Sequence, residues 1–108
     1  MSTLSTHVLD TALGKPAEGV TVHLTRTTDS SAVGSGVTDG DGRISEFTAD
    51  QLGPGVYQLR FDVAAYAQAT SQESFFPEVT VTFTITDERH YHVPLLLSPF
   101  AFSTYRGS

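Results

Sequence analysis

The sequence predicts an all-β fold, a sandwich of short strands, and three observations point to it. Apolar and polar residues alternate with a period of two in several segments, as they do in strands with one face in a core. Glycine, proline and aspartate residues interrupt the chain between these segments. The chain has 108 residues, enough for one core, so we expect a single domain over residues 1–108.

The clearest strands are three segments in which every second residue is apolar. They cover residues 20–25, 56–62 and 79–85. In the second segment, Tyr57, Leu59 and Phe61 are expected to face the core. In the third, the residues that share one face are Val79, Val81, Phe83 and Ile85.

Five further segments are weaker strand candidates, separated by turn residues. They cover residues 4–10, 34–39, 43–47, 91–98 and 100–106. The stretch Asp39-Gly40-Asp41-Gly42 supplies two glycines for positive φ angles and predicts a hairpin connection. Glycines and prolines in 12–19 and 53–55 mark other turns.

One segment departs from the strand pattern. Residues 62–69 are rich in alanine and contain neither glycine nor proline, which favours a short helix with Asp62 as its N-cap. Residues 71–77 are expected to form a loop.

Charge and cysteine content exclude several classes of function. A formal net charge of -6 argues against nucleic acid or an anionic membrane as a partner, because both reward a basic surface. The absence of cysteine excludes disulfides, iron–sulfur clusters, thiolate zinc sites and cysteine nucleophiles. No apolar run approaches the roughly 20 residues of a membrane span, and no secretory signal is evident, so we expect a cytoplasmic protein.

His7 and His92 are the histidines that we single out for chemistry. His92 lies in the segment 91–98, which carries apolar residues on both faces. One face must line the core, so we expect the other, with His92 on it, to meet a partner subunit. His23 is expected to be structural, and His90 to be solvated.

Pro94 conflicts with the strand predicted around it. Proline cannot donate a hydrogen bond to a ladder and usually marks an edge or a bulge. The sequence therefore predicts either a bulge at Pro94 or an interruption of the pairing there.

The last five residues combine an aromatic ring, a guanidinium, a flexible glycine and a hydroxyl, in the order Thr104-Tyr105-Arg106-Gly107-Ser108. On composition alone, such a segment is better explained as a frayed end or a Gly-Ser remnant of cloning.

Three stretches, far apart in the chain, stand out as motifs. The first is Leu4-Ser5-Thr6-His7-Val8-Leu9-Asp10-Thr11, and the second is Asp41-Gly42-Arg43. The third is His90-Tyr91-His92-Val93-Pro94-Leu95-Leu96-Leu97-Ser98-Pro99 followed by Tyr105-Arg106-Gly107-Ser108. In this order they resemble the N-terminal signature, the central arginine motif and the closing signature of the 5-hydroxyisourate hydrolases of the transthyretin-like family. The tail tetrapeptide separates these enzymes from true transthyretins.

The resemblance implies an active site that gathers residues from all these stretches. Its catalytic residues would be His7, Arg43, His92 and Ser108. Its substrate-binding residues would be Tyr105, Arg106 and Gly107. Ala101 and Phe102 depart from the small residue and the tyrosine often found at their positions, which implies altered packing rather than lost activity.

The resemblance also implies an architecture and a reaction. The architecture is a transthyretin-like sandwich of two four-stranded sheets with one short helix, assembled as a homotetramer around a central channel. The reaction is hydrolysis of 5-hydroxyisourate to 2-oxo-4-hydroxy-4-carboxy-5-ureidoimidazoline in urate degradation. Water attacks a ring carbonyl, the adjacent C–N bond breaks, and no cofactor is implied.

The implied residues suit this chemistry, which needs an activated water, a stabilised oxyanion and an oriented planar substrate. A neutral imidazole at His7 or His92 accepts the proton of water, and we take His92 as the main base. The guanidinium groups of Arg43 and Arg106 bind urate-like oxygens through paired hydrogen bonds. The Ser108 hydroxyl orients water or substrate.

Three other functions stay open at this point. A transthyretin-type carrier of hydrophobic hormones shares the fold without the chemistry. An immunoglobulin-like adhesion or carbohydrate-binding module explains the sandwich but leaves the histidines and the tail without a purpose. A metal site is suggested by the i,i+2 spacing of His90 and His92, although no acidic third ligand is evident.

Overall fold

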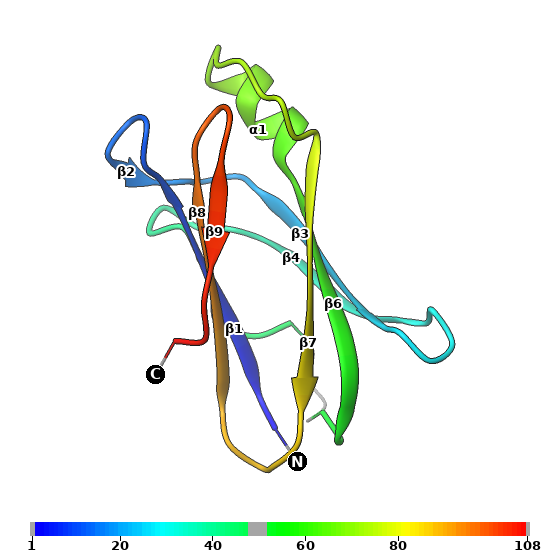
Figure 1. The fold of residues 1–108 in the computed structure, drawn as a ribbon. Helices are drawn as coiled ribbons and strands as arrows, with labels where there is room; N and C mark the ends of the chain where they lie inside the picture. The colour runs from blue at the N-terminus through cyan, green and yellow to red at the C-terminus, as the bar shows by residue number, and fades with distance from the viewer. Residues whose placement is uncertain (1, 48–51, 108) are drawn as a thin grey trace.

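The computed structural model describes residues 2–47 and 52–107, which form two β-sheets and one short helix (Figure 1). The elements in chain order are β1 (Leu4–Asp10), β2 (Lys15–Pro16), β3 (Thr21–Arg26), β4 (Ala32–Val37), β5 (Arg43–Ile44), β6 (Gly55–Asp62), α1 (Val63–Ala69), β7 (Glu78–Ile85), β8 (Tyr91–Leu97) and β9 (Phe102–Thr104). The predicted all-β sandwich with one short helix is confirmed.

The two sheets are named here after their central strands. The β1 sheet has the order β2-β1-β8-β9, with β5 also paired to β1, and the β3 sheet has the order β4-β3-β6-β7. The β3 sheet holds the four strands that were predicted. The β1 sheet has five strands instead of the predicted four. The additional strand is Lys15–Pro16, which pairs with Leu9 and Asp10 and lies in the segment 12–19, expected to form only a turn.

Side chains alternate between the two faces of each sheet as the sequence predicts. On β6, Tyr57, Leu59 and Phe61 are almost completely buried. On β1 the even-numbered residues are buried and the odd-numbered ones are half-buried. Each large apolar side chain that is fully buried contributes on the order of 1.5–3 kcal/mol to stability. The β1 sheet therefore has a core face and an opposite outer face, on which the site is built.

The turn at residues 39–42 forms, but the predicted hairpin is wrong. Gly42 donates its backbone N–H to the carbonyl of Asp39 at 2.9 Å and has a φ of 76°, so the chain does reverse. However, β4 pairs with β3 whereas β5 pairs with β1, so the turn connects two different sheets. Turn chemistry specifies a reversal and not the partner of the strand that follows. This crossing delivers Arg43 to the β1 sheet.

The predicted helix is confirmed as α1, at one end of the sandwich (Figure 1). The Asp62 carboxylate accepts a hydrogen bond from the Ala65 backbone N–H at 3.4 Å, as expected for an N-cap. The helix buries Val63, Tyr66 and Ala67. Within residues 2–47 and 52–107, no helix has the length and apolar character needed to cross a membrane.

Pro94 interrupts the pairing of β8 on one side only. Toward β1 the parallel register is continuous, and Pro94 lies opposite His7. On the other side, the ladder between β8 and β9 ends with the pair Leu95 and Thr104. Pairing resumes beyond Pro94 as a single bridge between His92 and Gly107. Of the two expectations for Pro94, interrupted pairing is the one confirmed. The gap leaves Tyr105 and Arg106 outside the ladder.

Candidate active site

Strand β1 brings three distant segments of the chain to one place on the outer face. His7 lies directly opposite Arg43 in the antiparallel pairing of β1 with β5. Ser5 lies directly opposite His92 in the parallel pairing of β1 with β8. Residues directly opposite in a sheet share a face, so His7, Arg43, Ser5 and His92 all project from the outer face.

A hollow of about 250 Å³ opens beside Ser5, Arg43 and His92. Its lining residues are Ser5, Thr6, Arg43, Ile44, Ser45, His90 and His92, and His7 is not among them. Small-molecule sites usually enclose roughly 300–1,000 Å³, so the hollow of a single chain is small and open for a substrate site. Its lining is rich in hydrogen-bonding groups, which suits a polar planar ligand.

His92 is the half-buried histidine of this hollow. Its Nδ1 lies 2.8 Å from the Ser5 hydroxyl oxygen. Burial lowers the pKa of His92 below its ordinary value, and the positive charges of Arg43, His7 and His90 lower it further, against an opposing hydrogen bond at Ser5. The neutral imidazole, the form that accepts a proton, is therefore the form that this environment favours.

Arg43 offers an exposed guanidinium at the rim of the hollow. Its backbone is held by the preceding turn, because the Arg43 N–H donates to the Asp39 carboxylate at 3.0 Å. That hydrogen bond is the main cause of the lowered pKa of Asp39. In the part of the chain that the structure describes, no carboxylate forms a salt bridge with the Arg43 side chain. Because it is exposed and lines the hollow, the guanidinium can reach an anionic or carbonyl oxygen of a ligand there.

Gly107 brings the C-terminal segment against the His92 ring. Its backbone N–H donates to the His92 carbonyl at 2.8 Å. A Cβ at this position would lie 2.5 Å from His92 Cδ2, closer than real Cβ atoms approach other heavy atoms. Only glycine allows this approach without displacing the ring or the tail.

The other tail residues diverge. Tyr105 is 58% exposed. The Arg106 guanidinium lies 4.6 Å from the centre of the Tyr91 ring, as in a cation–π contact, and Tyr91 is on the opposite face of β8 from His92. Ser108, predicted to be catalytic, lies outside the described residues.

His90 is exposed, as expected of a solvated residue, but its ring is held on both sides. Its Nδ1 lies 2.5 Å from the Thr3 hydroxyl and its Nε2 lies 2.8 Å from the Ser5 hydroxyl. Sequence reasoning missed Thr3 and Ser5 as parts of the site. The available signal was the position of Ser5 on the same strand face as His7. Among residues 2–47 and 52–107, no group of three or more histidines and carboxylates is arranged to hold a metal.

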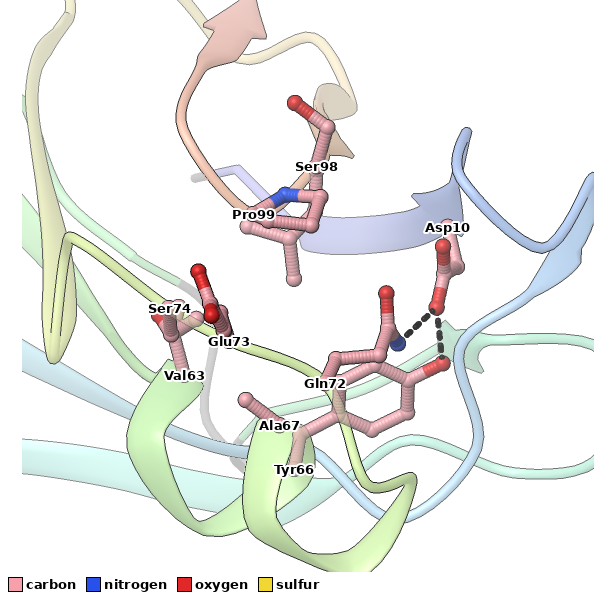
Figure 2. Close-up of a pocket in the computed structure, with 10 residues that line it drawn as sticks. Asp10, Val63, Tyr66, Ala67, Gln72, Glu73, Ser74, Ser98 and Pro99 are labelled. Carbon is pink, nitrogen blue, oxygen red and sulfur yellow. Dashed lines mark hydrogen bonds between the residues drawn. The ribbon is translucent and has the colours of Figure 1, made fainter.

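A second hollow lies beside α1, away from these residues (Figure 2). Asp10 Oδ2 accepts hydrogen bonds from the Tyr66 hydroxyl at 2.6 Å and the Gln72 amide at 2.9 Å. The free volume there is about 10 Å³, comparable to a single water molecule. This second hollow is therefore a packed polar network and not a substrate site.

Comparison with known proteins identifies the family. The sequence model described as "Transthyretin: HIUase/Transthyretin family" matches residues 4–107. The chain belongs to the HIUase/Transthyretin family. This confirms the resemblance drawn from the sequence signatures.

Relatives within the HIUase/Transthyretin family include named hydrolases. The chain is 47% identical over 113 residues to the 5-hydroxyisourate hydrolase of Mus musculus, which covers 99% of this chain and 96% of the mouse protein. It spans only 37% of the Arabidopsis thaliana protein named "Uric acid degradation bifunctional protein TTL", with 45% identity.

Solved structures of the HIUase/Transthyretin family show the same fold. The structure of Klebsiella pneumoniae 5-hydroxyisourate hydrolase matches with a TM-score of 0.92 and 44% identity, over 100% of this chain and 94% of that one. Sea bream transthyretin in complex with thyroxine matches with a TM-score of 0.88 and 34% identity, over 97% and 94% of the two chains.

Proposed function

We propose that this protein is a 5-hydroxyisourate hydrolase, which converts 5-hydroxyisourate to 2-oxo-4-hydroxy-4-carboxy-5-ureidoimidazoline in urate degradation. The observation that carries the proposal is the gathering of His7, Arg43, His92 and Gly107 on one face of the β1 sheet. Relatives named for this reaction, at identities of 42–47%, support it.

His92 is the proposed general base. Its Nδ1 is occupied by Ser5, and its Nε2 has no hydrogen-bond partner among residues 2–47 and 52–107. Neutral Nε2 accepts a proton from water as the water oxygen attacks a ring carbonyl carbon. The adjacent ring C–N bond then breaks, and the leaving nitrogen takes the proton back from the imidazolium.

Arg43 is the group proposed to stabilise the oxyanion. Negative charge develops on the carbonyl oxygen during attack, and the Arg43 guanidinium, which lines the hollow, stabilises it. His7 lies directly opposite Arg43, where it positions the substrate or shares the proton. The role proposed for Ser108, which is to orient water or substrate, rests on the resemblance alone.

The tail residues take different parts in this proposal. Gly107 is assigned to the binding wall because it lies against the His92 ring, and Tyr105 is assigned to it from the resemblance alone. For Arg106, predicted to bind substrate, the contact with Tyr91 supports a different task, the anchoring of the tail on the other face of β8. In that case the substrate contacts one guanidinium per chain.

We also propose that the site is completed by further copies in a homotetramer. The hollow is open, and the outer face of the β1 sheet also carries the apolar side chains of Leu9 and Leu96, which lie directly opposite each other. A partner over the outer face covers such residues and closes the hollow to bulk water. We propose the cytoplasm as the compartment of this activity, with which the absence of cysteine is compatible.

A hormone carrier is the competing proposal, favoured by the likeness to sea bream transthyretin in complex with thyroxine. A long diaryl ligand needs an open apolar channel. The hollow found here is small and lined by Arg43, His90 and His92, which suits a polar ring better.

The test is to generate 5-hydroxyisourate from urate with urate oxidase and follow its ultraviolet decay with and without the protein. We expect faster decay, and carbon-13 NMR of the product should show ring opening at the amide C–N bond. Decay equal to the uncatalysed background would refute the hydrolase proposal. Thyroxine binding without hydrolysis would establish the carrier instead.

A further inference from the structure

A line of hydrogen bonds connects His92 to the molecular surface. Ser5 Oγ lies 2.8 Å from His92 Nδ1 and 2.8 Å from His90 Nε2. On the far side of the His90 ring, Nδ1 lies 2.5 Å from Thr3 Oγ1. The pairing of Ser5 opposite His92 across β1 and β8 fixes this arrangement in the backbone.

The line has two directions in which Ser5 accepts from one imidazole and donates to the other, because a hydroxyl has one hydrogen and a neutral imidazole has one N–H. A third arrangement, in which both imidazoles donate to Ser5, leaves the Ser5 hydrogen without an acceptor in the line. In the first, His92 Nδ1–H donates to Ser5, the Ser5 hydroxyl donates to His90 Nε2, and His90 Nδ1–H donates to Thr3. In the second, every donor and acceptor is exchanged. The first direction leaves a lone pair on His92 Nε2, whereas the second places a hydrogen there.

We propose that Ser5 and His90 are positioning residues that hold His92 in the tautomer with its proton on Nδ1 and its free lone pair on Nε2. This inference deepens the proposed function and rests on it for its catalytic meaning. A general base must present a lone pair to the water that it activates, and only the first direction provides one.

The charge of the surroundings favours the first direction. The Arg43 guanidinium lines the same hollow and supplies only donors, so a lone pair on Nε2 complements it and another N–H does not. Thr3 is exposed, so solvent completes the hydrogen bonding of its hydroxyl in either direction. The pKa of His92 is lowered by burial and then by Arg43, His7 and His90, which favours the neutral ring. Only a neutral ring has two tautomers, so the hydrogen-bond direction decides which nitrogen carries the proton.

Gly107 helps to fix the orientation of the ring. It lies against the Cδ2 and Cγ edge of His92, with no room for a Cβ. A 180° flip of the ring exchanges Nδ1 with Cδ2, which takes Nδ1 away from Ser5 and turns it toward the backbone of Gly107. The ring is thus held by a hydrogen bond on one edge and by contact on the other.

The direct test is nitrogen-15 NMR of the histidine rings at a pH of about 8, where a histidine with an ordinary pKa of about 6.5 is neutral. In the wild-type protein we expect the shifts of His92 to show a protonated Nδ1 and an unprotonated Nε2. In Ser5→Ala the acceptor for Nδ1–H is lost, and we expect the Nε2–H tautomer to gain population. Ser5→Thr keeps a hydroxyl and should keep the wild-type tautomer.

Variants of His90 test the second step of the line. His90→Gln retains an acceptor for the Ser5 hydroxyl and should preserve the tautomer of His92, whereas His90→Ala should weaken it. Because His90 is exposed, both variants are expected to fold even if Ser5→Ala does not. Ser35→Ala and His23→Gln, both in the β3 sheet, are the matched controls. A wild-type His92 with its proton on Nε2, or tautomers unchanged in Ser5→Ala and His90→Ala, would overturn the proposal.

Activity separates this inference from the proposed function. We expect Ser5→Ala and His90→Ala to lower kcat roughly 10-fold or more with little change in KM. This loss is smaller than the ~100-fold or greater loss expected when the general base itself is removed. If the wild-type protein does not hydrolyse 5-hydroxyisourate, the proposed function fails and the tautomer result stands. If it does, and Ser5→Ala keeps both the tautomer and kcat, this inference fails alone.

Discussion

The backbone N–H of Gly107 donates to the carbonyl of His92 at 2.8 Å, and the glycine lies directly against the imidazole ring. The two residues come from the C-terminal segment and from β8, and the pairing gap at Pro94 lies between their bridge and the β8–β9 ladder. This contact joins the tail to the proposed base.

The Gly107 contact predicts a large effect from a single methyl group. In Gly107→Ala the Cβ would come within 2.5 Å of His92 Cδ2, so either the ring or the tail must move. We expect kcat to fall roughly 10-fold or more, because a displacement of about 1 Å in an active site has effects of this size. The melting temperature should change little. Gly40→Ala is the control, since nothing lies within 4 Å of its added Cβ, and equal kcat in the two variants would contradict the assignment.

Removing either histidine of the site should remove much of the activity. If both take part in proton transfer, His92→Ala and His7→Ala each lower turnover by ~100-fold or more. His23→Ala, in the β3 sheet, is expected to keep wild-type turnover. Steady-state kinetics on freshly generated 5-hydroxyisourate measure all three. A wild-type rate in His92→Ala would remove His92 from the role of base.

The lowered pKa of His92 predicts the pH dependence of catalysis. Burial, then Arg43, His7 and His90, favour the neutral ring, so the base stays competent until the pH falls below the ordinary value of 6.5. We expect kcat/KM to be flat above pH 6.5 and to decrease below it. A rate that stays constant down to pH 5 would argue against a histidine base.

Replacement of Arg43 should move that titration. In Arg43→Gln a positive charge near His92 is lost, the imidazolium is less disfavoured, and the pKa of His92 rises. The NMR titration midpoint of His92 should therefore shift to higher pH, independently of any loss of activity. Arg60→Gln, on the β3 sheet, provides the control. An unchanged midpoint in Arg43→Gln would show that the guanidinium does not act on His92.

The hydrogen bonds of the Asp10 carboxylate predict the pH below which the fold loses stability. Burial alone would raise its pKa, but hydrogen bonds from Tyr66, the Leu13 backbone and Gln72 outweigh burial and hold the pKa below 3.8. A carboxyl with a depressed pKa stabilises the fold above its unfolded-state value, and this stabilisation is lost as the pH falls through the folded-state value. The contribution of Asp10 should thus be complete at pH 5 and decrease below about pH 3.8.

Urea unfolding of Asp10→Asn tests this network. We expect a loss of roughly 1–3 kcal/mol at pH 7, because the carboxylate that accepts from the Tyr66 hydroxyl and the Gln72 amide is removed. The difference from the wild type should shrink as the pH falls below 3.8. Asp41→Asn, at an exposed position, is the control. A loss in Asp10→Asn that is the same at pH 3 and pH 7 would contradict the charged state assigned to Asp10.

Much of the fold could be read from local patterns. The inward faces of β6 and β7 follow from strict alternation, because a half-buried strand exposes every second residue to the core. The strand β2 could not be predicted, since two residues that include a proline carry no period. The hairpin at residues 39–42 was predicted wrongly because the turn is encoded locally, whereas the sheet that receives Arg43 depends on distant packing.

The site was predictable only where a signature marked it. Strand alternation puts His7 and Ser5 on the same face, but no local pattern shows that Ser5 lies opposite His92, because the register of parallel strands is set by the whole sheet. For the same reason His90 was expected to be merely solvated. The pairing of Arg106 with Tyr91 depends on how the tail crosses β8, which composition does not encode.

The measurement that tests the account most directly is the first-order decay of 5-hydroxyisourate with equal amounts of wild-type protein, His92→Ala and His23→Ala. We predict acceleration by the wild type and by His23→Ala, and a loss of ~100-fold or more in His92→Ala. Decay at the background rate in the presence of the wild type, or equal acceleration by all three proteins, would contradict it.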